Sequence, residues 1–215
     1  MELRLARRRE SWFPTGVGWL LLLVLLGAAS AAALRFLYPY LAVSEPVGAP
    51  IAIVEGWLDP AELDEAAAAI RRGGYRMVVT TGGPLHLWPR SPVEATFAER
   101  AAEYLRSRGI GPVVAVSAPI TRDNRTYKSA LMVRDWARSA GIQVKSLDVF
   151  SRGPHARRSR HFYRLVFRDA DIGVLALRPD GYDAARWWRS SAGAREVLEQ
   201  ATGLVWTFCF FRPAV

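Results

Sequence analysis

The residues best suited to chemistry gather in one basic stretch of the chain. Residues 149–168 contain six arginines and no Asp or Glu, and Ser-Arg-Gly-Pro-His-Ala-Arg-Arg-Ser-Arg opens the basic run at 151–160. The apolar residues before this run predict a strand, and its proline suits the first position of a helix. Ser151, His155 and Arg158 would then surround a helix N-terminus. Free backbone amides, the helix dipole and guanidinium groups there favour a phosphate or a carboxylate.

The same basic stretch is also compatible with a solvated helix face. Its place after a strand favours the ligand interpretation, because ligands of open α/β sheets bind at the carboxyl ends of the strands. We therefore expect Arg158 to bind an anionic group, while Arg160 and Arg164 point to solvent.

Other expected strand ends carry suitable groups. Glu55 follows an apolar run and could act as a general base, anchor a ligand or pair with an arginine. Gly82 and Gly83 follow a second run and would let backbone amides approach a ligand, although a plain turn explains them equally well. The predicted catalytic residues are Glu55 and His155, and the predicted ligand-binding residues are Gly56, Gly82, Gly83, Thr126, Ser151 and Arg158.

The elements that must position these groups alternate along the chain. Short apolar strands separated by amphipathic helices predict a doubly wound α/β fold, Rossmann-like, with a mostly parallel sheet of about five strands. A final helix is expected over about 183–201, and the apolar tail 204–211 is expected to be a strand or a packed tail. The expected strands are 51–54, 77–81, 112–116, 143–149 and 172–177, and the expected helices are 60–72, 93–108, 124–140 and the basic helix. Asp123 or Asn124 is expected to cap the third of these helices.

An apolar segment near the N-terminus predicts a membrane anchor. Residues 17–34 contain no charge and nearly reach the length needed to cross hydrocarbon, and four arginines precede them. Positive flanks stay in the cytoplasm, so we expect a single-pass inner (cell) membrane protein with its main domain outside. The expected division is a basic arm over 1–16, an anchor over 17–38, a tether over 39–49 and one domain over 50–215. A cleaved signal peptide is the alternative, and it too exports the domain.

Composition narrows the function classes. One cysteine excludes an internal disulfide, and three scattered histidines without an acidic cluster argue against a metal site. No dinucleotide or P-loop fingerprint and no serine-hydrolase elbow is present, so no cofactor is assigned. The net charge of +9 would permit nucleic-acid binding, but an exported domain would rarely meet nucleic acid.

The order of several motifs resembles a known family. Thr-Gly-Gly-Pro at 81–84, Arg-Thr-Tyr-Lys-Ser-Ala at 125–130 and Ser-x-x-x-His-x-x-Arg-Ser at 151–159 are similar to the SanA/ElyC/YdcF-like envelope proteins over about residues 50–180. That family usually has Thr-x-Glu-Asn at the second motif, whereas here Thr126 is followed by Lys128 and Ser129. The resemblance implies a Rossmann-like domain, often membrane-anchored, that acts in cell-envelope or surface-polysaccharide homeostasis.

Two hypotheses about function follow. In the first, the exported domain binds an anionic envelope metabolite that is phosphate-containing, lipid-linked or nucleotide-like. The stronger version of this hypothesis is that the domain also transforms the metabolite chemically. In the second, it is a non-catalytic module whose basic patch holds anionic lipid headgroups or an envelope-assembly protein partner.

Overall fold

The computed structural model describes residues 14–85, 96–121 and 124–213, which fall into two compact units. The first unit, Met1–Phe36, contains most of helix α1 (Gly16–Leu41). By length and composition, α1 could cross a membrane. The second unit, Leu37–Val215, contains the remainder of the fold.

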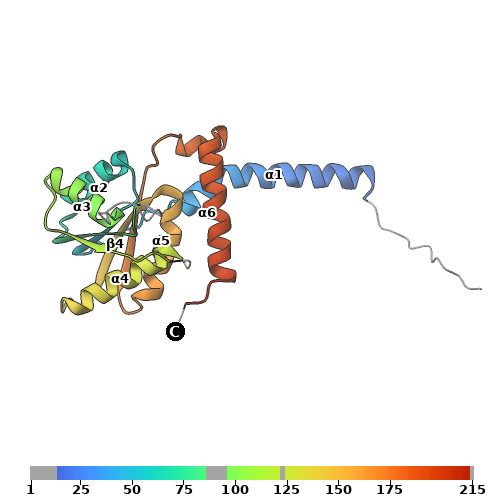
Figure 1. Ribbon diagram of the computed structural model, residues 1–215. Coiled ribbons are helices and arrows are strands. Elements are labelled where there is room, and N and C mark those ends of the chain that lie inside the picture. Colours follow the sequence, from blue (N-terminus) through green and yellow to red (C-terminus); the bar gives the residue numbers. More distant parts are fainter. Residues whose placement is uncertain (1–13, 86–95, 122–123, 214–215) are drawn as a thin grey trace, which may run out of the picture. The chain divides into compact units, whose positions relative to one another are not determined.

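A five-stranded parallel sheet forms the centre of the second unit (Figure 1). This confirms the predicted α/β class. The strand order β3-β2-β1-β4-β5 changes direction between β1 and β4, and such a switch point is where open α/β sheets bind ligands. The strands are β1 (Ile51–Glu55), β2 (Met77–Gly82), β3 (Val113–Ser117), β4 (Ser146–Arg152) and β5 (Asp171–Leu177).

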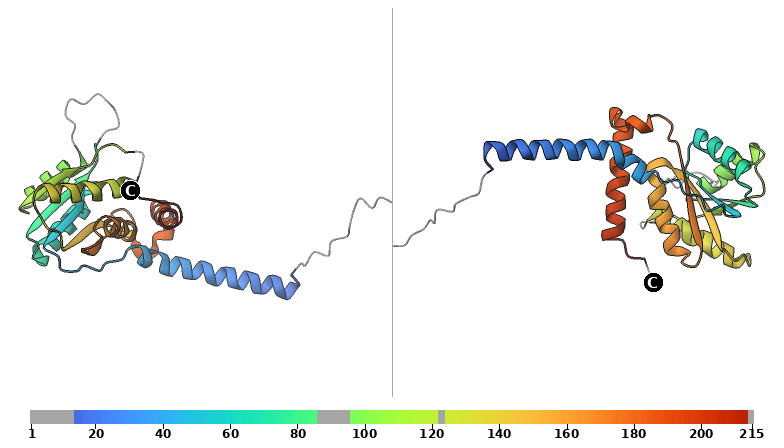
Figure 2. Two further views of the ribbon diagram at one scale, coloured as in Figure 1. Left: turned by 90° about the horizontal axis from the view of Figure 1, so that it is seen from below. Right: turned by 180° about the vertical axis from the view of Figure 1, so that it is seen from behind.

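Helices cover both faces of the sheet, because its strands are apolar on both faces. Alternate residues of β1 enter different cores: Ala52 and Val54 pack with α2 and α3, whereas Ile51 and Ile53 pack with α4 and α5. Helix α6 runs beside α5 (Figure 2). The helices are α2 (Pro60–Gly73), α3 (Phe97–Ser107), α4 (Arg125–Ser139), α5 (Ala156–Val166) and α6 (Ser191–Cys209), with short 3-10 turns η1 (Gly153–His155) and η2 (Ala184–Arg189).

Helix ends follow the expected capping chemistry in most places. Gly74, in the left-handed region at φ 68°, ends α2. Asn124 caps α4 by accepting a hydrogen bond from the Tyr127 amide at 3.0 Å, while the alternative cap Asp123 lies outside the described residues. Helix α3 begins at Phe97 rather than at 93, after the N-cap Thr96, and residues 93–95 lie outside the described part.

The expected tether over 39–49 is instead part of the folded unit. Helix α1 continues through Pro39 to Leu41, which is buried, as is Val43. The buried carboxylate of Asp148 then accepts hydrogen bonds from the amides of Val47 at 2.8 Å and Ala49 at 3.1 Å. The prolines and glycine of 39–49 predicted a break in regular structure. They could not predict that this segment would hydrogen-bond to Asp148, which lies about 100 residues later in the chain.

The C-terminal expectations were also wrong in part. The region expected as one helix over 183–201 is divided into η2 and α6, with Ser190 as the N-cap of α6. Helix α6 then runs on to Cys209, so most of the expected strand or packed tail is helical. Strand β4 starts and ends three residues later than the predicted 143–149.

Candidate functional site

Three neighbouring strands end with polar side chains on the same face of the sheet. Glu55 of β1 is in register with Thr81 of β2, and Val54 is in register with Phe150, so Glu55 lies beside Ser151 of β4. Successive strand residues point to opposite faces, and the residues two before these three belong to the core under α4 and α5. Glu55, Thr81 and Ser151 therefore lie at the carboxyl-end edge of that core, at the switch point.

Two serines hold the Glu55 carboxyl group. Ser151 Oγ donates to Glu55 Oε2 at 2.5 Å, and Ser159 Oγ of α5 donates to Oε1 at 2.7 Å. The two hydroxyl oxygens are 3.2 Å apart. Glu55 is 2% exposed and both serines are fully buried, so this carboxyl group is shielded from water.

His155 lies at the end of η1, next to the carboxyl group. Its Nε2 is 3.8 Å from Glu55 Oε1 and 3.3 Å from Thr126 Oγ1 of α4. Its Nδ1 is 2.8 Å from Gln200 Oε1 of α6 and 3.1 Å from Arg158 Nη2. The ring thus connects α4, α5 and α6 at the carboxyl group.

Burial controls the charge of the two titratable groups. Loss of water raises the pKa of Glu55 from its usual 4.5 to about 7, although the serine hydrogen bonds oppose this. Burial, with the nearby Arg158 charge, lowers the pKa of His155 from 6.5 to about 3. The imidazole is therefore neutral near pH 7, whereas the carboxyl group is poised between its two forms.

The neutral imidazole has two arrangements of its proton. With the proton on Nδ1, the ring donates to Gln200, and Nε2 accepts from Thr126. With the proton on Nε2, that nitrogen faces Glu55, and Nδ1 accepts from Arg158. A shift between the two forms would change whether the nitrogen that faces Glu55 carries a proton.

Three buried polar atoms on this face have no hydrogen-bond partner among the described residues. They are Thr81 Oγ1, Arg158 Nε and Tyr163 OH. A buried, unsatisfied polar group costs about 1–3 kcal/mol, so three on one face of a sheet are unusual for a purely structural core. Thr126, Arg158 and Trp57 are only half-buried and form the accessible side of this centre.

The predicted site residues therefore divide into two sets. Glu55, Ser151, His155, Arg158 and Thr126 come together in one cluster.

The three predicted glycines instead contact the start of α3. A Cβ atom on Gly56 would collide with the Phe97 carbonyl group, and one on Gly82 would lie 2.7 Å from Phe97 Cβ. The carbonyl oxygen of Gly83 accepts the Phe97 amide at 2.8 Å.

The arginines of the basic stretch do not form one patch. Arg152 pairs with Glu62 at 2.6 Å and with Asp59. Arg157 donates to the Tyr40 carbonyl oxygen.

The expectation that Arg160 points to solvent is wrong. It pairs with Glu45 at 2.5 Å and donates to the Ile172 carbonyl oxygen at 3.0 Å. Arg164 is exposed, as expected, and Arg158 is the member that contacts His155.

The predicted site residues omit four members of the centre: Ser159, Tyr163, Thr81 and Gln200. Ser159 and Tyr163 follow His155 by four and eight residues, so helical periodicity could have placed them on the same face. Thr80 and Thr81 are adjacent in β2 and so point to opposite faces of the sheet. The Thr80 hydroxyl group donates to the Ala98 carbonyl oxygen of α3 on the other face. Gln200 carries no local signal, since its partner lies 45 residues away.

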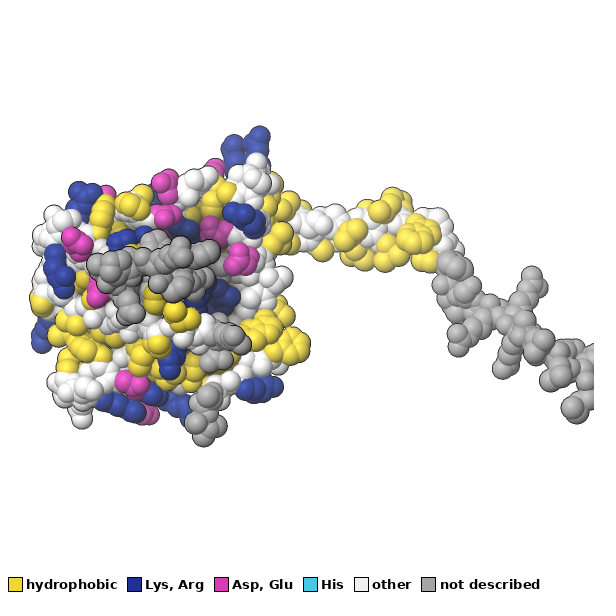
Figure 3. Space-filling model, viewed as in Figure 1, with side chains coloured by type: hydrophobic (Ala, Val, Ile, Leu, Met, Phe, Trp, Pro, Cys, Tyr) yellow, Lys and Arg dark blue, Asp and Glu magenta, His cyan; other side chains and the backbone are white. Residues whose placement is uncertain are grey.

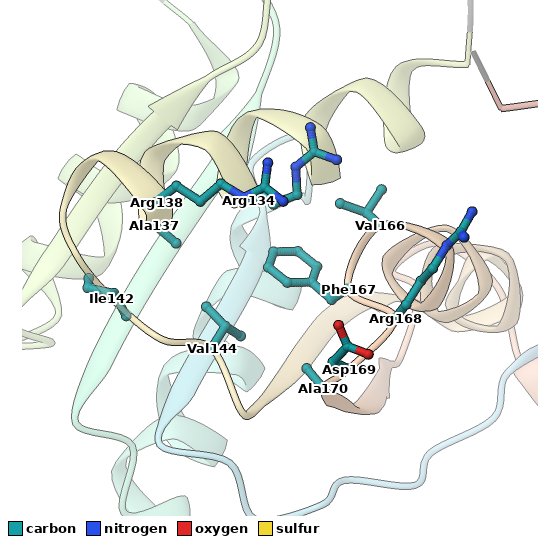
Figure 4. A pocket seen from close by; sticks show the side chains of 10 residues that line it. All are labelled: Arg134, Ala137, Arg138, Ile142, Val144, Val166, Phe167, Arg168, Asp169 and Ala170. Carbon is teal, nitrogen blue, oxygen red and sulfur yellow. The ribbon is translucent and has the colours of Figure 1, made fainter. Parts of the chain in front are cut away.

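A hollow lies at the edge of the sheet opposite the centre around Glu55, before the amino ends of β4 and β5 (Figure 4). Arg134, Arg138 and Arg168 surround Phe167 there. Arg134 pairs with Asp135 at 2.9 Å, and Arg138 and Arg168 are exposed. This hollow has no buried charged group, which separates it from the centre around Glu55.

No protein-family model matches the chain, and no curated protein matches it. Across the described residues, His, Cys, Asp and Glu form no group of three or more that could hold a metal ion. The geometry of the centre is therefore the guide to function.

The raised pKa of Glu55 predicts a specific pH dependence of stability. A carboxyl group whose pKa rises on folding contributes most below its unfolded value, and this contribution is lost as pH rises through the folded value. The free energy of unfolding of the wild type, relative to Glu55→Gln, should therefore fall between pH 4.5 and about 7. The fall should reach up to about 3 kcal/mol, at about 1.36 kcal/mol per pKa unit.

Denaturant titrations of both full-length proteins in the same detergent would measure this difference. The lowered pKa of His155 acts in the opposite sense, since its stability contribution is lost as pH falls below 6.5. It is common to both proteins and cancels in the comparison. A difference that stays constant across this range would mean that Glu55 titrates normally.

Proposed function

We propose that the second unit binds an anionic, phosphate-containing metabolite of the cell envelope at the centre around Glu55, and that Glu55 exchanges a proton with the bound group. The main support for this proposal is that three groups meet at the switch point. They are the buried carboxyl group of Glu55, the neutral imidazole of His155 and the guanidinium group of Arg158, whose Nε has no hydrogen-bond partner among the described residues.

The charge balance of the centre favours an anion. His155 is neutral, and Glu55 is largely protonated below its pKa of about 7. Glu199 of α6 is then the acidic neighbour of Arg158, and the exposed Arg125 at the start of α4 adds a second positive charge, so positive charge is in excess. Arg158 Nε and Thr81 Oγ1 have no hydrogen-bond partner among the described residues, so both could donate to an anion.

Each residue has a chemical role in this proposal. Arg158 and Thr126, on the accessible side, would hold the anionic group. Glu55, whose pKa lies near the working pH, suits general acid or base catalysis. His155 would orient the bound group, and Ser151 and Ser159 would fix the carboxyl group in one rotamer.

The N-terminal helix supports an envelope location. Four arginines precede an apolar helix that is long enough to cross a membrane, so the second unit would lie outside the inner membrane. The motif resemblance to the SanA/ElyC/YdcF-like envelope proteins supports the same setting and a role in envelope or surface-polysaccharide homeostasis.

The alternative, a module that binds anionic headgroups through a basic patch, has less support. It needs the arginines of residues 149–168 to act together, but Arg152, Arg157 and Arg160 are engaged by Glu62, Tyr40 and Glu45. An assembly partner would have to recognise a different surface.

A pair of α5 variants tests the proposed ligand site. Inorganic phosphate and pyrophosphate should raise the melting temperature of the wild type and of Arg164→Ala, but not of Arg158→Met, because a charged hydrogen bond is lost. At about 1.5–3 kcal/mol, one such bond corresponds to about a 10- to 150-fold loss of affinity. Calorimetric titration of the three proteins would measure it.

Arg158→Met keeps the unbranched stem of the half-buried side chain without its charge, and its melting temperature without phosphate controls for folding. Equal responses of Arg158→Met and Arg164→Ala would contradict the site assignment. Glu55→Gln and His155→Ala separate catalysis from binding, since a pure binding module would keep its cellular function with both changes at normal abundance.

Reporter fusions test the proposed orientation. Alkaline phosphatase fused after Val215 should be active and a green-fluorescent fusion dark, because the arginines before the helix should hold the N-terminus in the cytoplasm. The opposite pattern would place the second unit in the cytoplasm and remove the envelope setting.

A further inference from the structure

The outer face of α6 carries several large apolar side chains that remain largely exposed. Val205 is 60%, Trp206 47% and Phe208 55% exposed, and Leu198 and Phe210 are also exposed. The opposite face of the same helix, with Val197 and Leu204, is buried. Hydrophobic side chains gather at the C-terminal end of α6 (Figure 3). A soluble domain rarely leaves so many large apolar side chains together in water.

The C-terminal part of α6 carries no charge. Residues 200–211 contain no charged side chain, and the exposed Glu199 precedes them while Arg212 follows them. His161 of α5 packs against Phe208, with ring centroids 4.7 Å apart. Exposed aromatic and aliphatic residues on one side of a helix are typical of helices that lie in the headgroup region of a bilayer.

The chain itself brings this face close to a membrane. Six residues separate Leu34, the end of the apolar segment, from Leu41, which is 1% exposed within the second unit. Even fully extended, such a link spans only about 3.5 Å per residue. Tyr38, within that link, packs on Tyr182, and Tyr182 packs against Gly193 of α6. The chain thus enters the second unit beside the N-terminal end of α6, and the exposed side chains over 205–210 lie at the other end of this helix.

We propose that the outer face of α6, formed by Leu198, Val205, Trp206, Phe208 and Phe210, lies in the lipid interface of the membrane to which the chain is anchored. This inference rests on the proposed membrane attachment but not on the ligand or chemistry of the centre. The occupant of the face is the bilayer itself. Because α6 also carries Gln200, which contacts His155, docking would set the centre beside lipid headgroups.

The single cysteine of the chain provides the test. Cys209 is exposed at the end of α6, among the proposed lipid-facing residues, so one fluorophore can be attached there without other changes. Full-length protein labelled with an environment-sensitive nitrobenzoxadiazole probe would be reconstituted into vesicles of phosphatidylglycerol and phosphatidylethanolamine. We expect blue-shifted emission that brominated lipids quench.

A matched control moves the label to another helix. In Cys209→Ser with Ser139→Cys, the probe lies at the exposed end of α4, and we expect red, unquenched emission. Val205→Asp with Phe208→Asp should abolish quenching at Cys209, while the protein still floats with the vesicles through its anchor.

Three results would overturn the proposal. Flotation with an unquenched Cys209 probe would mean that α6 faces water. A blue shift that grows with protein concentration, without quenching by brominated lipid, would identify a second copy of the chain as the occupant. Failure to float would remove the membrane attachment itself, whereas phosphate binding at Arg158 would be unaffected by any of these outcomes.

Discussion

Glu55 keeps its carboxyl group away from water at the point where the chain order of the sheet changes direction. A buried carboxylate is costly unless it is hydrogen-bonded or protonated, and both conditions are in place. Ser151 and Ser159 donate to its two oxygens, and burial raises its pKa to about 7. The surrounding elements meet this constraint together: β4 supplies one serine, α5 the other, and η1 sets His155 beside them.

The same constraint explains which parts of the site could be predicted from the sequence. Apolar strands ending in Glu55 and Ser151 predicted a shared sheet edge, because parallel strands align their carboxyl ends. The basic stretch suggested one anion patch and was misleading. Its arginines are divided between the end of β4 and different sides of α5, and their partners Glu45, Glu62 and Tyr40 are far away in the chain. Gln200 and the packed segment over 39–49 depend on long-range contacts that local patterns do not encode.

The glycines illustrate a different limit of sequence reasoning. A pair of glycines after a strand predicts a close approach of something to the backbone, but not what approaches. At Gly56 and Gly82 the approaching group is the start of α3, which needs this space to pack over β1 and β2. A ligand and a neighbouring helix leave the same signal in the sequence. That the glycines serve one face of the sheet and the polar centre the other is recognisable only from the placement of the side chains.

Carbon-13 NMR of the labelled carboxyl group would measure directly whether Glu55 holds a proton near neutral pH. Full-length protein with carbon-13 in its glutamate carboxyl groups would be titrated in detergent, and the Glu55 signal would be identified by its loss in Glu55→Gln. We predict a midpoint near 7 for this signal, well above the usual 4.5. A Glu55 signal that titrates with the surface glutamates near 4.5 would mean that the carboxyl group is an ordinary ion and holds no proton at neutral pH.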